Sequence, residues 1–284
     1  MLRIETQGLQ RLREFPFGNE DFAALRGLVK SLTGINLSEQ KRELVYGRLS
    51  RRLRALKLKS FREYRELLAS DPQELVHLSN AITTNLTSFF RERHHFEYLR
   101  DELLRPLAAD ARAKRRVRIW SAGCSTGEEP YSIAMSVIEA LPDLTRWDVR
   151  VLATDLDSDA LERARAGTYP AERVRSVGPA RLARFFTQCE EGSDLAYRVI
   201  PEVAALVTFK QLNLMDAWPM KGPLDVIFCR NTVIYFDKET QRDLFARMGG
   251  LQRPGDKLFL GHSESLFQVS TLYGLVGRTI YRRT

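Results

Sequence analysis

The stretch Trp120-Ser-Ala-Gly-Cys-Ser-Thr-Gly-Glu-Glu-Pro-Tyr-Ser132 decides the fold of this chain. A short apolar run, Val117 to Trp120, precedes it, and an apolar run with helical spacing, Ile133 to Leu141, follows it. This order predicts a strand, a turn of small residues and a helix. Small residues let the backbone pass close to a ligand, and a helix N-terminus offers unpaired N–H groups. Such a turn typically holds a nucleotide-like ligand.

Two acids, Glu128 and Glu129, stand at the start of the predicted helix. Their charges would repel a diphosphate, whereas a ligand with a positive charge, hydroxyls or an amino group suits them. The pair therefore favours S-adenosylmethionine over NAD or ATP.

Strand and helix patterns alternate from residue 117 onward. Strands are predicted at 117–121, 149–154, 207–211, 224–229 and 257–261, and helices at 128–141, 158–166 and 238–251. This alternation predicts a doubly wound, Rossmann-like α/β domain over 117–284, with a parallel sheet covered by helices on both faces. Residues 168–206 interrupt the pattern and are too long for a plain connection, so we expect an inserted small β subdomain with its own helix, 179–186.

The N-terminal part, residues 1–82, shows helical spacing only, which predicts a small all-helical domain. Residues 83–91, Thr-Thr-Asn-Leu-Thr-Ser-Phe-Phe-Arg, break this spacing. We therefore expect residues 83–116 to form a junction and a linker helix, Glu92 to Leu104, which ends at Pro106.

The composition describes a basic protein of 284 residues with net charge +8. Residues 41–62 hold nine Lys or Arg against one acid, and such a surface attracts an acidic partner, either nucleic acid or protein. No apolar stretch approaches the ~20 residues that cross a bilayer, and no signal peptide opens the chain, so a cytoplasmic protein is expected. The three cysteines lack paired or metal-binding spacing, so neither a disulfide framework nor a metal site is expected.

Polar residues follow successive predicted strands. Asp155 ends the second strand, Asn213 and Leu214 follow the third, and Asn231 and Thr232 follow the fourth. Ligands of parallel α/β sheets bind outside the carboxyl ends of the strands. Asp155 suits ribose hydroxyls, and the Asn213–Leu214 pair suits the edge and face of adenine. The pattern predicts a nucleoside-cofactor site, with S-adenosylmethionine as the cofactor.

Five stretches carry a family resemblance. They are residues 83–91 with His94-His95-Phe96, residues 121–132, Ala-Thr-Asp-Leu-Asp at 153–157, Phe-Cys-Arg-Asn-Thr-Val-Ile-Tyr-Phe-Asp at 228–237, and Gly-His-Ser-Glu-Ser at 261–265. Together they resemble chemotaxis receptor methyltransferases of the CheR type over nearly the whole chain. That family transfers a methyl group from S-adenosylmethionine to glutamate side chains on the helical cytoplasmic domain of chemoreceptors. The resemblance implies the same adaptation reaction here, with a glutamate methyl ester and S-adenosylhomocysteine as products.

The resemblance also implies roles for individual residues. The cofactor would be bound by Asn85, Thr87, Arg91, Gly123, Glu128, Asp155, Asn213, Leu214, Asn231 and Thr232. Glu128 would hold the methionine amino group or its neighbourhood, with Glu129 as the weaker candidate. Tyr235 would lie near the transferred methyl, and Arg91, preferred over Arg230, would fork onto the acceptor carboxylate.

The resemblance also implies a partner for the basic residues of 41–62. The N-terminal domain would dock on the Glu-rich helical bundle of a chemoreceptor through Arg48, Arg51, Arg52, Arg54, Lys57 and Lys59. In the family the inserted β segment can hold a receptor's C-terminal tail by adding a strand. Here its turn, 190–194, carries three acids and one glycine, so we expect an enzyme that does not need the tail. A monomer that neither binds nucleic acid nor inserts into a membrane is expected.

Two other functions stay open at this point. A methyltransferase acting on RNA or a small molecule would suit the positive charge, but RNA binding predicts stacking aromatics beside the basic residues. Residues 41–62 offer only Tyr46 and Phe61, which have the pattern of core positions. The second alternative is a non-catalytic S-adenosylmethionine-binding scaffold in a signalling array.

Overall fold

The computed structural model describes residues 13–110, 112, 115–141 and 143–284. The chain divides into two compact units, with the boundary between Ile82 and Thr83. None of the described helices is both long and apolar enough to cross a membrane.

The first unit is all-helical, as predicted. Its elements are α1 (Asn19–Thr33), η1 (Glu39–Lys41), α2 (Arg42–Leu56), α3 (Phe61–Ser70) and α4 (Pro72–Ile82). Gly34 ends α1 in the left-handed conformation, the Ser60 side chain accepts from the backbone N–H of Glu63 at the start of α3, and Pro72 opens α4. Apolar side chains at helical spacing, such as Phe22, form its own buried core.

A linker helix opens the second unit. It consists of α5 (His94–Tyr98), a π-helical turn η2 (Leu99–Leu104) and α6 (Arg105–Ala109). The prediction that it ends at Pro106 was wrong, because the helix continues to Ala109. The Arg105 N–H bonds to the Arg100 carbonyl five residues back, and this wider turn carries the helix past the proline, which has no N–H to give.

The sheet of the second unit has seven strands in the order β6-β2-β1-β7-β8-β10-β9. Five of them run parallel: β1 (Arg116–Ala122), β2 (Asp148–Asp155), β6 (Val207–Gln211), β7 (Val226–Cys229) and β8 (Lys257–Leu260). The sequence did not predict the two C-terminal strands, β9 (Tyr273–Gly277) and β10 (Ile280–Arg283), which pair antiparallel at one edge. β9 lies at the edge of the sheet, and its Leu275 and Val276 are exposed. Such a strand does not need the continuous apolar run by which a buried strand is recognised in a sequence.

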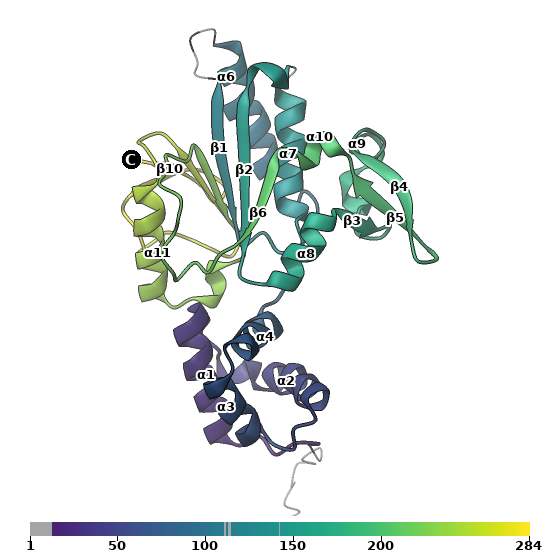
Figure 1. Cartoon of the computed structure of the whole chain (residues 1–284). Helices are drawn as coiled ribbons and strands as arrows, with labels where there is room; N and C mark the ends of the chain where they lie inside the picture. Colours follow the sequence, from purple (N-terminus) through teal and green to yellow (C-terminus); the bar gives the residue numbers. More distant parts are fainter. Residues whose placement is uncertain (1–12, 111, 113–114, 142) are drawn as a thin grey trace, which may run out of the picture. The chain divides into compact units, whose positions relative to one another are not determined.

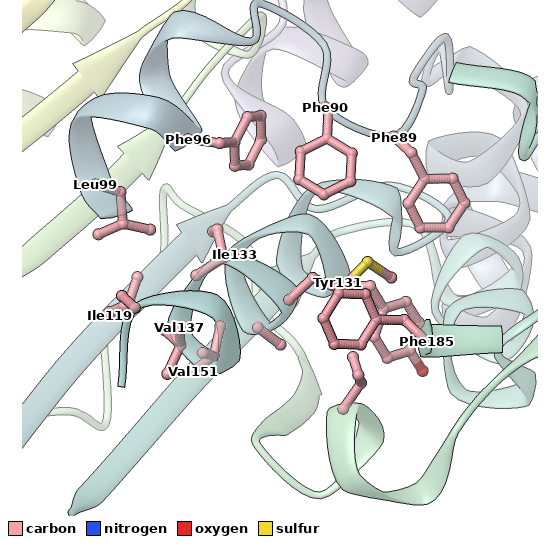
Figure 2. Close-up of a cluster of buried hydrophobic side chains, with 14 of the residues drawn as sticks. Phe89, Phe90, Phe96, Leu99, Ile119, Tyr131, Ile133, Val137, Val151 and Phe185 are labelled. Carbon is pink, nitrogen blue, oxygen red and sulfur yellow. The ribbon is translucent and has the colours of Figure 1, made fainter. Parts of the chain in front are cut away.

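Helices cover both faces of this sheet (Figure 1). On one face lie α7 (Glu128–Ala140) and α8 (Ser158–Ala166), and on the other lies α11 (Lys238–Gly250). Neighbouring residues of β1 enter two different cores: Ile119 packs with the first helix layer (Figure 2), whereas Trp120 packs with α11. The short helices η3 (Leu144–Arg146) and η5 (Val233–Tyr235) lie in connections. The doubly wound α/β fold is therefore confirmed.

The segment 168–206 forms a three-stranded antiparallel sheet in the order β3-β5-β4. Its elements are β3 (Thr168–Pro170), η4 (Arg175–Val177), α9 (Pro179–Phe185), β4 (Phe186–Glu191), β5 (Asp194–Val199) and α10 (Pro201–Ala204). Tyr169, Phe185 and Phe186 join the core around α7, together with Phe89 of the junction. Figure 2 shows Phe89 and Phe185 in this cluster. This segment, the insertion from here on, is thus packed onto α7.

Candidate active site

The turn between β1 and α7, residues 123–127, lies at the carboxyl end of the sheet. The N–H groups of Gly123 and Cys124 both donate to the Thr154 carbonyl, which ties the turn to β2. Gly123 has φ +83°, and a Cβ there would lie 2.3 Å from Thr232 Oγ1. Gly127 has φ +96°, and its Cβ would lie 2.9 Å from the Tyr169 hydroxyl. Both positions therefore require glycine.

Asp155 stands at the end of β2, beside this turn. One carboxylate oxygen accepts from the Ser125 N–H at 2.6 Å and the other from the Asp157 N–H at 2.9 Å. Burial raises the pKa of Asp155 to about 6, against the effect of these backbone hydrogen bonds. Each oxygen retains accepting capacity beyond its backbone amide, so the pair is able to receive two neighbouring hydroxyl groups.

The junction residues reach the same place. Asn85 donates to Asp157 Oδ2 at 2.6 Å, and its own oxygen accepts from the Ser125 hydroxyl at 3.1 Å. Thr83 also donates to Asp157. Asn85 therefore ties the junction to the turn and to the end of β2, while Thr87 is half-buried in the same segment.

Arg91 lies in a backbone segment of unusual conformation. Its neighbours Phe90 and Glu92 have φ +53° and +58°, which few residues other than glycine adopt. The Phe90 N–H donates to Ser132 Oγ at 3.0 Å, and the Arg91 carbonyl accepts from Arg230. The guanidinium of Arg91 donates to the Leu86 carbonyl at 2.8 Å and is only half-buried. Strained backbone of this kind is concentrated at functional sites.

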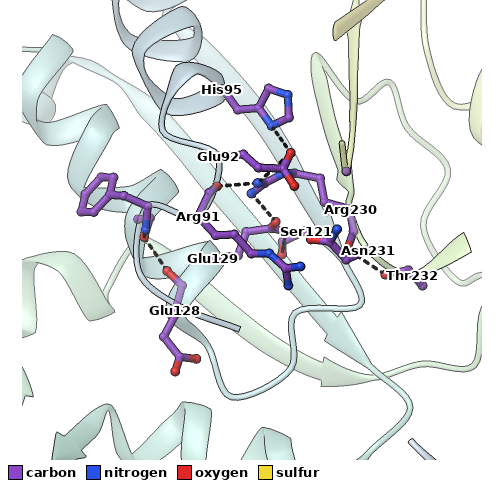
Figure 3. A network of polar contacts seen from close by, with 12 residues as sticks. Arg91, Glu92, His95, Ser121, Glu128, Glu129, Arg230, Asn231 and Thr232 are labelled. Carbon is purple, nitrogen blue, oxygen red and sulfur yellow. Dashed lines mark hydrogen bonds and ion pairs between the residues drawn. The ribbon is translucent and has the colours of Figure 1, made fainter. Parts of the chain in front are cut away.

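Arg230 lies between two carboxylates (Figure 3). Its side chain is 2% exposed, 3.0 Å from Glu129 Oε2 and 3.3 Å from Glu92 Oε2. Burial alone would raise the pKa of Glu92, but the charge of Arg230 and the bonds from His262 lower it to about 2. Because this guanidinium is committed to two internal acids, it is not available to an acceptor carboxylate. Of the two arginines considered, Arg91 is the accessible one.

His95 lies beside this network as a neutral group. Burial, with Arg230 adding to it, lowers the pKa of His95 to about 3. Its Nε2 faces the Arg278 carbonyl at 3.0 Å and therefore carries the proton. The 3.5 Å approach of its Nδ1 to Glu92 is consequently not an ion pair.

The two acids of the turn point to different places, because successive helix residues are rotated by about 100°. Glu128 is fully buried, accepts from Thr126 Oγ1 at 2.7 Å and lies 2.5 Å from Nη2 of Arg173 in the insertion. Glu129 instead accepts from Ser121 Oγ at 2.7 Å and from Arg230. Burial raises the pKa of Glu129, with Arg230 opposing. Glu129 is thus the acid at the ends of β1 and β7, and the assignment of Glu128 to the methionine amino group stays a prediction.

The loop after β7 carries Asn231, Thr232 and Tyr235. One buried carboxylate, Glu264, organises this loop: it accepts from the N–H groups of Gly261 at 2.6 Å, Asn231 at 2.8 Å and Val233 at 2.9 Å. The Thr232 hydroxyl lies 3.3 Å from the Ala122 carbonyl. Tyr235 is half-buried on η5. Sequence reasoning missed the role of Glu264, although the Gly-His-Ser-Glu-Ser motif contains it.

Asn213 and Leu214, the pair expected to contact adenine, both make contacts within the protein. Asn213 Oδ1 accepts from the Met215 N–H at 3.0 Å, which closes a local turn. Leu214 is 8% exposed and belongs to the core around α11. Both residues stand after β6, at the expected end of the sheet, and their contact with adenine stays a prediction.

The residues expected to dock a partner fall into two groups. Arg48 donates to the Ala81 and Ile82 carbonyls, and Arg52 forms a two-pronged pair with buried Glu74 at 2.7 and 2.5 Å. These two arginines have partners within the bundle, and their assignment to docking stays a prediction. Arg54 pairs with Glu14 at the surface. The exposed basic residues with no such structural role described are Arg51, Lys57 and Lys59.

Comparisons with known proteins identify the family of this chain. Residues 20–83 match the CheR methyltransferase all-alpha domain, and residues 85–282 match the CheR methyltransferase SAM-binding domain. Chemotaxis protein methyltransferase 2 of Pseudomonas aeruginosa is 47% identical over 95% of this chain and 95% of that protein. A probable chemotaxis protein methyltransferase of Rhizobium etli is 45% identical over 90% and 97%. The chemotaxis protein methyltransferase of Escherichia coli is 41% identical over 96% and 94%. This chain therefore belongs to the CheR methyltransferase family.

Proposed function

We propose that this protein transfers a methyl group from S-adenosylmethionine to glutamate side chains on the cytoplasmic helices of chemoreceptors. The products are glutamate methyl esters and S-adenosylhomocysteine, and the output is adaptation in chemotaxis. The observation that carries the proposal is that Asp155 stands at the carboxyl end of β2, while Glu129 and the Arg91 carbonyl are held beside the ends of β1 and β7, in a chain of this family.

The donor set suits the cofactor. Asp155 has accepting capacity left for the ribose hydroxyls, and Glu129 offers a carboxylate to the methionine ammonium. Two acids also suit a ligand with sulfonium and ammonium charges. Asn213 and Leu214 would contact the adenine, and Thr87, Asn231 and Thr232 would line the remaining wall. When bound, the cofactor supplies a methyl group made electrophilic by the sulfonium.

The acceptor needs positioning rather than activation. A glutamate is already ionised near pH 7, so the reaction needs no general base. Its oxygen would take the methyl group in place of the sulfonium sulfur, so that an ester and a thioether would form without any proton transfer. The half-exposed Arg91 would fork onto the second oxygen of the acceptor, and Tyr235 would lie near the methyl group. Alignment of this kind contributes up to roughly 7–11 kcal/mol in well-oriented reactions.

The acceptor protein would bind the exposed basic residues of α2 and of the segment that directly follows this helix. Arg51, Lys57 and Lys59 are exposed, and a Glu-rich helical bundle has the complementary charge. Charge complementarity of this kind raises the association rate and falls with salt.

The test is transfer of tritiated methyl from S-adenosylmethionine to purified chemoreceptor cytoplasmic fragments, with and without C-terminal tails. We expect a product that releases methanol in mild base. An Arg91→Met variant should lose most of kcat, with Arg91→Lys retaining more because it keeps the charge. A base-stable product would contradict glutamate as the acceptor. Cofactor binding without any product would favour the scaffold alternative.

A further inference from the structure

We infer that Tyr169 and Arg173 of the insertion are positioning residues for the cofactor turn. In this view the inserted sheet is a working part of the cofactor site. The inference rests on the proposed function, in that residues 123–129 hold S-adenosylmethionine.

The contacts form one cluster. The Tyr169 hydroxyl donates to the Thr126 carbonyl at 2.7 Å. Arg173 Nη2 lies 2.5 Å from Glu128 Oε1 and donates to Thr126 Oγ1 at 3.1 Å. Thr126 Oγ1 in turn donates to Glu128 Oε2 at 2.7 Å. Tyr169 and Arg173 of the insertion thus contact the carbonyl and hydroxyl of Thr126 and the carboxylate of Glu128.

The turn needs such support because its backbone is strained. Ser125 has φ +50°, a conformation that disfavours residues with a Cβ, and Gly127 follows at φ +96°. Ser125 is also the residue whose N–H donates to Asp155 and whose hydroxyl donates to Asn85. A shift of Thr126 therefore reaches Asp155 through one intervening residue, Ser125.

Arg173 is the charged partner of Glu128. Glu128 is completely buried, and a buried carboxylate is tolerated only when it is paired and hydrogen-bonded. Its first position in α7 places it at the positive end of the helix dipole, but Arg173 supplies the full opposite charge. The Arg173 side chain is 32% exposed, so the pair stands where the insertion meets solvent.

A second ion pair provides a matched control. Arg181, also in the insertion, binds Glu139 of α7 in two-pronged fashion at 2.7 and 2.9 Å. Glu139 follows Glu128 on the same helix by 11 residues, about 16 Å along its axis, and contacts no part of the turn in any described bond. The two glutamates allow the same substitution with and without contact to the turn.

The experiment measures binding of S-adenosylhomocysteine to the full chain by calorimetry. Arg173→Met and Glu128→Gln should each raise its dissociation constant about tenfold or more, because a buried charge pair is broken at the turn. Glu139→Gln should leave it within about twofold, and the double variant Arg173→Met with Glu128→Gln should fall short of the sum of the singles. Tyr169→Phe should weaken binding by several fold, and Arg173→Lys should retain more affinity than Arg173→Met.

Kinetics separate positioning from general damage. The KM for S-adenosylmethionine should rise in Arg173→Met, while the KM for the receptor stays unchanged. Wild-type affinity in Arg173→Met, or an equal loss in Glu139→Gln, would overturn the inference. If Arg173→Met does not fold, Tyr169→Phe and Arg173→Lys decide in the same way. Failure of the wild-type protein to bind would count against the proposed function itself.

Discussion

Cofactor binding should weaken as the pH falls through about 6, because Asp155 must be ionised to accept two hydroxyl groups. Burial raises the pKa of Asp155 to about 6. If only the ionised form binds, the apparent dissociation constant scales with the inverse of the ionised fraction. It should then be about 11-fold larger at pH 5 than at pH 8, and only about 1.1-fold larger at pH 7.

Protonation of Asp155 should weaken cofactor binding without unfolding the protein. The folded-state pKa lies above that of the unfolded chain, so the folded state takes up a proton first as the pH falls. Protonation of this group between pH 7 and pH 5 therefore favours the folded state. A far-UV circular dichroism spectrum at pH 5 checks that the other groups leave the fold intact.

The assay is calorimetric titration with S-adenosylhomocysteine at pH 5, 6, 7 and 8, in buffers with different ionisation enthalpies. At pH 6 binding should release about half a proton. Asp155→Asn should weaken binding at pH 7 by about 1.5–3 kcal/mol, the range for hydrogen bonds to charged groups, and should flatten the pH profile. Asp159→Asn, at an exposed position of α8, removes the same charge nearby. It should change neither the affinity at pH 7 nor the pH profile. Equal wild-type affinity at pH 5 and pH 8, or a pH step retained in Asp155→Asn, would show that ionisation of Asp155 does not control cofactor binding.

Three further variants test other parts of the account. Arg51→Glu combined with Lys57→Glu should raise the receptor KM at low salt in methylation assays and leave S-adenosylhomocysteine affinity unchanged; an unchanged receptor KM would exclude these residues from docking. Arg52→Met should destabilise the first unit by about 3 kcal/mol in thermal melts, because Glu74 would stay buried without its partner; a melt like that of the wild type would contradict this. Glu264→Gln should lower kcat and stability together, by about 1–3 kcal/mol in unfolding free energy, because converging backbone N–H groups lose a charged acceptor. Unaltered kcat in that variant would show that the loop does not depend on the carboxylate.

The sequence predicted the parallel sheet because buried strands appear as apolar runs, and it predicted the site because polar residues follow those runs. Asp155 was identifiable for this reason, since the end of β2 fixes its place. The choice between Glu128 and Glu129 was not, because it depends on how α7 is rotated against the sheet. Only the packed structure shows that one faces Arg173 and the other Arg230.

Contacts between residues far apart in the sequence also could not be predicted. The basic residues of α2 look alike in the sequence, yet Arg52 is committed to Glu74, 22 residues away, while Arg51 is exposed. Arg230 likewise resembled a substrate-binding arginine until the structure placed it between two acids. Local spacing describes one helix or strand at a time, so it does not separate structural arginines from accessible ones.

The most direct test of the proposed reaction is mass spectrometry of a chemoreceptor cytoplasmic fragment after incubation with this protein and S-adenosylmethionine. We expect the added mass of one methyl group on specific glutamates, absent when those glutamates are replaced by alanine and strongly reduced with Arg91→Met. A methyl group on lysine or arginine instead, or no modification of any receptor fragment that the protein binds, would contradict glutamate methylation.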